Sequence, residues 1–239
     1  MKRIVLLFAA VLFVVGTTMA QTENKSDVTI SADSDDNDVT VKQTIDGDDV
    51  NVSEVAIFVE SSDNDVSVTQ SGENQDSEVE ISFGSSENDV TVKQRDEDQE
   101  SDVTITGISV GNEVDVLQEG EDNESDVTIA DLSWLNDVDV VQDGENNQSE
   151  VEIYGLSSFN DVEVNQDGDG LESEVEIAVG SDFNSVDIEQ DGEDHESDVD
   201  IIFDSNFNTV DVEQDGDYST SDVEVSFGSD GNMIEVEQK

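Results

Sequence analysis

Apolar and polar residues alternate along most of this chain, in short segments that recur at a fixed interval. One segment has the form Ser-x-Val-x-Ile, as in residues 101–105, and the other has the form Asn-x-Val-x-Val-x-Gln, as in residues 88–94. Alternation with a period of two is typical of a β-strand with one buried face. Because Val and Ile are expected inside, the Ser, Asn and Gln of the same parity are predicted to face inward as well.

The two segments belong to a repeat unit that occurs nine times. The units start at Ser26, Ser53, Ser77, Ser101, Ser125, Ser149, Ser173, Ser197 and Ser221, with one step of 27 residues and then a period of 24. In every unit an Asn follows the Ser by eleven residues, and a Gln follows that Asn by six. A fixed period in this range indicates a solenoid. The sequence therefore predicts an all-β fold, a β-solenoid of nine stacked 24-residue strand–arch–strand repeats over residues 26–239.

Stacking of such units would place each inward polar residue beside its own kind in the neighbouring turns. We expect these columns to form ladders in which side chains bond to their copies, because an unpaired buried amide costs about 1–3 kcal/mol. The ladder positions in the middle of the chain are Ser101, Asn112, Gln118, Ser125, Asn136, Gln142, Ser149, Asn160, Gln166, Ser173, Asn184 and Gln190.

Other recurring residues indicate turns and arches. Six glycines follow Gln by two residues, where we expect a tight turn that needs a positive φ; they are Gly72, Gly120, Gly144, Gly168, Gly192 and Gly216. Between the two strands of a unit, large apolar residues fall into columns: Leu135, Phe159, Phe183 and Phe207; Leu132 and Leu156; Phe83, Phe203 and Phe227. We expect these columns, and the single Trp134, to pack as a second small apolar cluster rather than to serve as exposed contacts for partners.

The charge of the chain is strongly one-sided. There are 64 Asp and Glu against 7 Lys and Arg, a formal net charge of −57, which excludes nucleic acid as a partner. Such a charge favours disorder in an unpatterned chain, but here the Val and Ile are patterned. The turns after Gln carry the candidate Ca²⁺ ligands Asp143, Glu145, Asp167, Asp169, Asp191 and Asp215. The alternative interpretation of these carboxylates is a solvated acidic face that binds cations only diffusely.

The first twenty residues differ from the repeats. Lys2 and Arg3 precede an apolar run over 4–15, and Thr18-Met19-Ala20 places small residues before a cleavage point. This pattern predicts a signal peptide over residues 1–20, followed by a short N-terminal segment over 21–25, and hence a secreted protein. No other apolar run is long enough to cross a bilayer, and the chain contains no Cys that could form a disulfide.

No recurring or clustered catalytic chemistry is present, so we predict no catalytic residue, no enzyme activity and no organic cofactor. His195 is the single histidine. Its neighbours Asp194, Glu196 and Ser197 are adjacent in sequence, which rarely gives triad geometry. The sequence therefore favours an exposed loop histidine.

The unit Asn-x-Val-x-Val-x-Gln-x-Gly, as in residues 64–72 and 160–168, resembles the repeats of curlin, the subunit of curli fibres; residues 88–94, NDVTVKQ, are especially close. The resemblance covers residues 26–239. It implies a β-solenoid with two strands per turn, passage through an outer-membrane secretion channel, a nucleator, and assembly into extracellular amyloid at the cell surface for adhesion and biofilm.

Two hypotheses for function remain. Only residues 21–25 precede the first repeat after the signal peptide, and the last repeat stops at Gln238-Lys239. We therefore expect both terminal turns to expose unpaired strands, which template addition of another chain. The first hypothesis is thus a fibre subunit that polymerises with itself end to end. The second is a soluble, non-polymerising β-solenoid adhesin that binds Ca²⁺.

Overall fold

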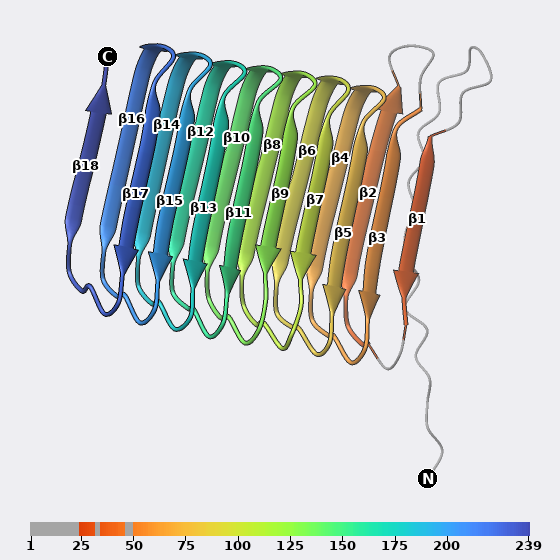
Figure 1. Ribbon diagram of the computed structural model, residues 1–239. Helices are drawn as coiled ribbons and strands as arrows, with labels where there is room; N and C mark the ends of the chain where they lie inside the picture. Colours follow the sequence, from red (N-terminus) through yellow and green to blue (C-terminus); the bar gives the residue numbers. More distant parts are fainter. Residues whose placement is uncertain (1–23, 32–33, 46–49) are drawn as a thin grey trace.

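The computed structural model describes residues 24–31, 34–45 and 50–239, and it is all-β (Figure 1). Two parallel sheets of nine strands each form a β-solenoid of about nine turns, as the repeat predicts. Within the described residues, no helix has the length and apolarity needed to cross a membrane. The predicted signal peptide, residues 1–20, lies outside the part of the chain that the structure describes.

Each turn contributes one strand to each sheet, and neighbouring turns pair in parallel. The first sheet contains β1 (Lys25–Ile30), β3 (Val52–Phe58), β5 (Asp76–Ser82), β7 (Glu100–Ile105), β9 (Glu124–Ile129), β11 (Gln148–Tyr154), β13 (Glu172–Ala178), β15 (Glu196–Ile202) and β17 (Thr220–Ser226). The second contains β2 (Asp38–Ile45), β4 (Asp65–Glu73), β6 (Asp89–Glu97), β8 (Glu113–Glu121), β10 (Asp137–Glu145), β12 (Asp161–Asp169), β14 (Ser185–Glu193), β16 (Thr209–Asp217) and β18 (Met233–Gln238). The register is that of the sequence repeat: Val127 pairs with Val151, and Gln142 pairs with Gln166.

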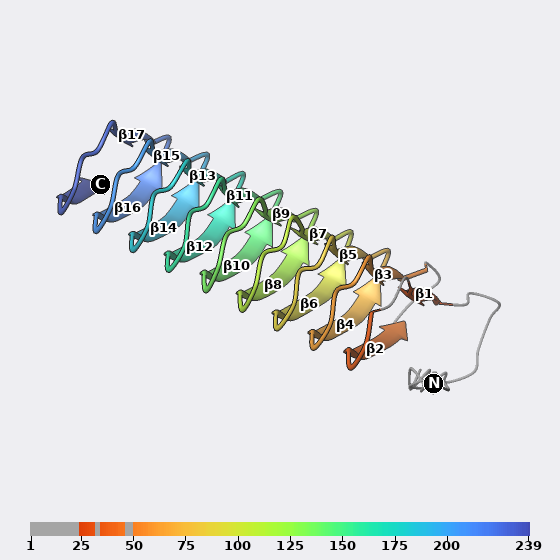
Figure 2. The same cartoon turned by 90° about the horizontal axis from the view of Figure 1, so that it is seen from below.

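The core is a stack of Val and Ile between the two sheets, which face each other in Figure 2. In one interior turn, Val103 and Ile105 of β7 and Val114 and Val116 of β8 are completely or almost completely buried. Burial of one such side chain is worth about 1.5–3 kcal/mol before the chain entropy is subtracted. The period-two alternation therefore gives the inward and outward faces that were predicted from the sequence.

Two kinds of loop join the strands and form the two narrow edges of the solenoid. We call the edge made by the loops from each odd-numbered strand to the following even-numbered one the arch edge, the lower edge in Figure 1. The opposite edge, where even-numbered strands lead into odd-numbered ones, we call the acidic edge. Loop backbones bond from turn to turn as the strands do; for example, Asn146 N donates to Glu121 O at 2.9 Å.

The six glycines after Gln have positive φ angles, between 108° and 152°, as predicted. The prediction that they form the tight turn itself is wrong. Each lies near the end of its strand, and the chain reverses two residues later, at left-handed residues such as Asn74, Asp122 and Asn146. Glycine is required at the earlier position because a Cβ on Gly144 would lie 1.9 Å from the carbonyl oxygen of Gly168 in the next turn.

Candidate assembly interface

A glutamine ladder runs through the interior along the second sheet. Each Gln Nε2 donates to the Oε1 of the Gln in the following turn, as from Gln118 to Gln142 and from Gln142 to Gln166, both at 2.9 Å. The same Nε2 also donates to a backbone carbonyl, Glu100 O in the case of Gln118. The predicted positions Gln118, Gln142, Gln166 and Gln190 all lie in this ladder and are fully buried.

An asparagine ladder runs parallel to it, with its hydrogen bonds in the opposite direction. Asn136 donates both its backbone N and its Nδ2 to Asn112 Oδ1 in the preceding turn, at 3.0 and 3.1 Å. Asn160 and Asn184 repeat this contact, each with the Asn one turn earlier. From side chain to side chain, the glutamines thus donate toward the C-terminal end of the stack and the asparagines toward the N-terminal end. Asn136 Nδ2 also donates to the backbone of the following turn, at Ser157 O.

The serine column behaves differently from the prediction. Ser101, Ser125, Ser149 and Ser173 stack in register and are buried, but their Oγ atoms have no hydrogen-bond partner among the described residues. Turns are about 4.8 Å apart, too far for one short serine side chain to reach the next. The expectation that these hydroxyls bond to their copies is therefore wrong.

A second serine column, eight residues after the first, does make hydrogen bonds. Ser133 Oγ donates to Ala130 O at 2.7 Å, and Ser133 N donates to Ser109 Oγ at 3.3 Å. These serines lie in the arch, where a backbone N is not already paired within a sheet. Their hydroxyls therefore act as acceptors between turns.

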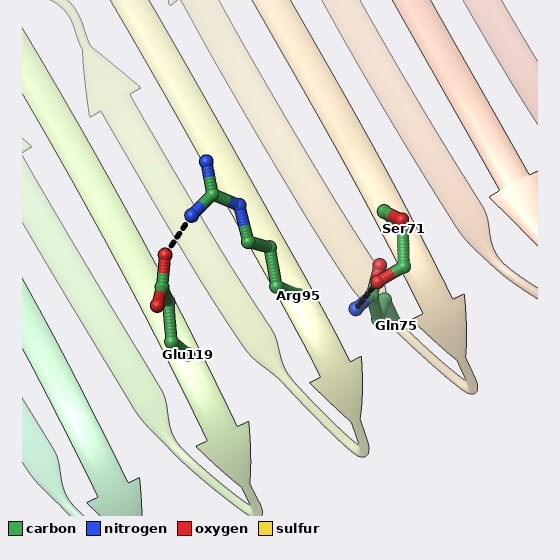
Figure 3. Close-up of polar contacts among 4 residues, drawn as sticks. All are labelled: Ser71, Gln75, Arg95 and Glu119. Atoms are coloured by element: carbon green, nitrogen blue, oxygen red, sulfur yellow. Dashed lines mark hydrogen bonds and ion pairs between the residues drawn. The ribbon is translucent and has the colours of Figure 1, made fainter.

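A further inward polar column was missed by the sequence analysis. It lies two residues before the first serine of each unit, and its members in turns two to eight are buried: Asn51, Gln75, Gln99, Asn123, Asn147, Leu171 and His195. The terminal turns contribute Asn24 and Ser219, which are half-buried. Asn147 N donates to Asn123 Oδ1 at 3.0 Å, and Asn147 Nδ2 donates to Gly168 O at 2.9 Å. In Figure 3, Gln75 turns back toward Ser71, whose carbonyl oxygen accepts from Gln75 Nε2.

His195 belongs to this column, so its interpretation as an exposed loop residue is wrong. It is only 1% exposed, Nδ1 accepts from Ser219 N at 3.1 Å, and Nε2 lies 3.3 Å from Asp191 O. An Nδ1 that accepts a hydrogen bond leaves the ring proton on Nε2, which then donates to that carbonyl. His195 therefore makes the same two kinds of contact as Asn123, which accepts from the backbone N one turn later and donates to the carbonyl oxygen four residues earlier, Glu119 O.

The candidate Ca²⁺ ligands fall into two columns beside the acidic edge. Asp143, Asp167, Asp191 and Asp215 are stacked in register in one column, whereas Glu145 and Asp169 belong to the other. Among the described residues, no group of three or more His, Cys, Asp or Glu is arranged to hold a metal ion. The first column continues to Glu119, which is ion-paired with Arg95 of the preceding turn (Figure 3).

Another acidic column follows the outer face of the first sheet through all nine turns. It consists of Asp27, Glu54, Glu78, Asp102, Asp126, Glu150, Glu174, Asp198 and Asp222. Desolvation within the column raises the pKa of Asp102 to about 6, and the carboxylates of Glu78 and Asp126 contribute to this increase. The pKa of Asp126 is raised by the same causes, desolvation first and then Glu150 and Glu124. The carboxylates of this outer face therefore repel one another at neutral pH.

The arch edge carries exposed apolar side chains, so the expected packing into a second buried cluster is wrong. Phe159 and Phe183 stack with ring centroids 4.7 Å apart, and Phe183 and Phe207 stack at 5.0 Å, but Phe207 is 63% exposed. Trp134 is also substantially exposed, at 43%, with its Nε1 donating to Ile108 O. We call Leu135, Phe159, Phe183 and Phe207 the phenylalanine row.

A longer row lies beside it and involves two consecutive left-handed residues in each arch. In turns two to nine, one of these two residues is large and apolar, and the other is Gly, Asp or Glu. We call the apolar members the ridge; they are Val59, Phe83, Ile108, Leu132, Leu156, Val179, Phe203 and Phe227, all exposed. The left-handed conformation costs a non-glycine residue roughly 1–2 kcal/mol, so these side chains are not explained by the stability of the solenoid.

The terminal turns bury their inward residues incompletely. Ile234 and Val236 of β18 are half-buried, whereas their partners Val210 and Val212 in β16 are fully buried. Val28 of β1 is likewise half-buried beside the fully buried Val55. The inner surface of the solenoid is therefore accessible at β18 and at β1.

No protein-family model, curated protein or solved structure matches this chain. What the solenoid can do must therefore be inferred from its own surfaces. These are two ladders of opposite direction, acidic columns on the outside, an apolar arch edge, and incompletely covered terminal turns.

Proposed function

We propose that this protein is a secreted structural subunit that assembles end to end into extracellular fibres. The observation that carries the proposal is the direction of the two ladders. Gln238 ends the glutamine ladder with its Nε2, after accepting from Gln214, and Asn232 ends the asparagine ladder with its Oδ1, after donating to Asn208. The last turn thus offers a donor in one column and an acceptor in the other.

The first turn offers the complementary set. Gln43 Nε2 donates into the ladder toward Gln70, which leaves Gln43 Oε1 facing away from the stack; Asn37 accepts from Asn64, which leaves the Asn37 backbone N facing away. Placed against the last turn of another copy, Gln43 Oε1 would accept from Gln238 Nε2, and Asn37 would donate to Asn232 Oδ1. Two last turns placed face to face would instead oppose two Oδ1 acceptors. The join is therefore directional, head to tail.

The sheets and the core support the same join. β17 and β18 are the edge strands at the last turn, and β1 and β2 are those of the same two sheets at the first turn; an unpaired edge is a template for another strand. Addition of a further turn would complete the burial of Ile234 and Val236, worth about 0.8 kcal/mol per CH₂ group. The new contact would repeat those between existing turns, so a fibre would continue the same solenoid.

The resemblance of the repeat to curlin supports this proposal and extends it. By that resemblance, the fibres belong to the cell surface and serve adhesion and biofilm. The chain would be exported through an outer-membrane channel, and a nucleator would start fibre assembly. The sequence pattern of residues 1–20 supports export.

The test is a charge placed on the inner side of the last turn. Val236→Lys puts an unpaired cation where the next copy would pack, so elongation at that end should stop. Because its first turn is intact, this variant should still dock on a growing wild-type end and block it at substoichiometric amounts. Thioflavin kinetics and negative-stain microscopy measure both effects, and fibre diffraction of the wild type should show spacings near 4.7 Å and about 10 Å.

Glu235→Gln is the matched control, since it changes the net charge by the same amount in the same strand but on the outward side. It should elongate at least as fast as wild type. A wild-type protein that stays monomeric at high concentration and high salt would contradict the proposal and favour the soluble adhesin. Unimpaired growth of Val236→Lys would show that the last turn is not the joining surface.

A further inference from the structure

The arch edge has a second property that end-to-end assembly does not use. In each of the eight arches from turn two to turn nine, one residue of the left-handed pair is large and apolar, but its position in the pair varies: Phe83 is followed by Gly84, whereas Leu132 is preceded by Asp131. Gly and Asp are the residues that this backbone accepts most easily. Gly or Asp would therefore fit at either position of the pair, yet every one of these arches keeps an apolar side chain at one of them.

These side chains stabilise their own chain little. The ridge and the phenylalanine row are exposed, from 36% for Val59 to 79% for Phe227, while Val and Phe are among the residues least suited to a positive φ. A shallow groove follows the ridge from turn two to turn five; Val59, Phe83, Ile108 and Leu132 line it, together with Gly84, Thr106, Gly107 and the acidic residues Glu60 and Asp131. A continuous apolar surface of this kind on an otherwise charged protein marks a contact site.

Charge identifies the arch edge as the place where two copies of this chain can meet. Both outer faces and the acidic edge carry columns of carboxylates, which repel a second copy with the same net charge of −57. By contrast, residues 107–111 and 155–159 of the arch edge contain no charged residue at all. In turns two to nine, the acidic residues of the arches are Glu60, Asp63, Glu87, Asp131, Asp182, Asp204 and Asp230.

Spacing and area point to the same occupant. The stacked rings repeat at 4.7–5.0 Å along the edge, and another copy of this solenoid presents an apolar row with the same repeat. Twelve half-exposed apolar side chains, eight in the ridge and four in the phenylalanine row, would bury several hundred Å² on each copy. That is on the order of the ~800 Å² per partner found in stable interfaces.

We propose that two copies of this chain pair sideways through their arch edges, with the ridge and the phenylalanine row of one copy packed against those of the other. The contact lies on a different surface from the end-to-end join and does not depend on it. Pairing should be strongest in high salt, where the remaining like charges are screened to within about 3 Å.

The first test removes the three aromatic side chains of the phenylalanine row. The triple variant Phe159→Gly, Phe183→Gly and Phe207→Gly should fold, because Gly111 and Gly231 occupy the same column with positive φ. In 1 M salt, light scattering should give the wild type twice the molar mass of the triple variant. If both proteins form fibres, the wild-type fibres should have twice the mass per unit length of the variant fibres. Tyr218→Gly is the control: it removes an exposed aromatic residue from a left-handed position on the acidic edge and should keep the wild-type mass.

The second test needs no loss of packing. The chain has no Cys, so Phe183→Cys introduces a single thiol on the arch edge and Tyr218→Cys a single thiol on the acidic edge. Mild oxidation should link Phe183→Cys into covalent dimers and leave Tyr218→Cys monomeric. Within one end-to-end fibre, equivalent residues are nine turns or about 43 Å apart, so the link cannot form along a fibre.

The outcomes separate the two assemblies. Covalent dimers without fibres would support sideways pairing and contradict the end-to-end proposal, whereas fibres of a single solenoid's mass would do the reverse. Equal masses of wild type and triple variant, together with no Phe183→Cys dimer in 1 M salt, would overturn the proposed pairing and leave the arch edge for a different partner.

Discussion

At the residue scale, the tightest constraint lies where neighbouring turns touch through their backbones. In the interior turns, the glycine column brings the Cα of each glycine against a carbonyl oxygen one turn later, which belongs to Asp96 in the case of Gly72 and to the next glycine in the others. A Cβ on Gly120, Gly144 or Gly192 would lie 1.8–2.0 Å from that oxygen, a separation that no rotamer relieves. Gly216 has the same kind of φ, 108°, but nothing lies within 4 Å of its Cβ position. Glycine is thus required in the interior turns both by its positive φ and by the close approach of a carbonyl oxygen, whereas at Gly216 only the positive φ requires it.

This difference gives a prediction for Gly144→Ala. The substitution adds backbone strain of about 1–3 kcal/mol and an overlap with Gly168 O whose relief costs typically another 1–3 kcal/mol. Gly216→Ala carries only the strain. We therefore expect Gly144→Ala to lower the free energy of unfolding more than Gly216→Ala by roughly 1–3 kcal/mol, measured by urea denaturation. Equal losses would mean that the turns are not in the close contact that the structure shows.

At the element scale, the strands were predictable and the loops were not. In a strand, every second residue faces inward, so the parity of Val and Ile assigned the Asn and Gln ladders from the sequence alone. In the arch, consecutive left-handed residues break that parity, so Trp134 and Phe183 were assigned to a packed cluster when they are exposed. No periodic pattern distinguishes a buried aromatic residue from an exposed one at such positions.

The missed polar column has a different cause. Its residues lie two before the first serine, so strand parity would have placed them inside. They were overlooked because the column mixes Asn, Gln, Leu and His, and a search for identical residues does not find it. What the members share is burial and, in Asn123, Asn147 and His195, an acceptor for the backbone N one turn later.

The ladder columns differ in what they contribute, which predicts opposite effects of two alanine substitutions. Asn136→Ala removes the Nδ2 donations to Asn112 Oδ1 and Ser157 O, and it removes the acceptor of Asn160 N and Nδ2, so we expect a loss of at least about 3 kcal/mol in unfolding free energy. Ser125→Ala removes a buried hydroxyl that has no partner, so stability should stay the same or rise. Urea denaturation of both variants measures the difference.

Ser133→Ala is the control for Ser125→Ala, since the Ser133 hydroxyl does donate to Ala130 O. It should cost about 0.5–1.5 kcal/mol, the usual net value of one hydrogen bond. A loss for Ser125→Ala as large as that for Ser133→Ala would contradict the unpaired state of the first serine column.

At the scale of the whole molecule, charge opposes the same stacking that the core favours. Every turn adds carboxylates to the outward columns, and two like charges about 4.8 Å apart repel by roughly 0.9 kcal/mol in bulk water and by more near a protein surface. The effect is visible in the direction of the pKa shifts. The pKa values of Glu163, Glu174 and Asp198 are all raised, that of Glu163 chiefly by the charge of Asp187 and the others by desolvation first.

These raised pKa values predict that mild acid stabilises the solenoid. A carboxyl whose pKa is higher in the folded than in the unfolded state binds protons on folding, so the free energy of unfolding rises as the pH falls. For Asp102, the window runs from about 6 down to the ordinary value of 3.8. The urea midpoint should therefore increase from pH 7 to pH 4, and fibre growth should accelerate over the same range.

Three controls test whether charge is the cause. Raising NaCl to 1 M should flatten the dependence of the midpoint on pH, because salt screens the repulsion between carboxylates. Asp102→Asn should also reduce this dependence. Ca²⁺ and Na⁺ compared at equal ionic strength separate specific bridging of the columns from screening. A midpoint that falls on acidification, as for proteins whose carboxylates have lowered pKa values, would show that the acidic columns are not stacked as in this structure.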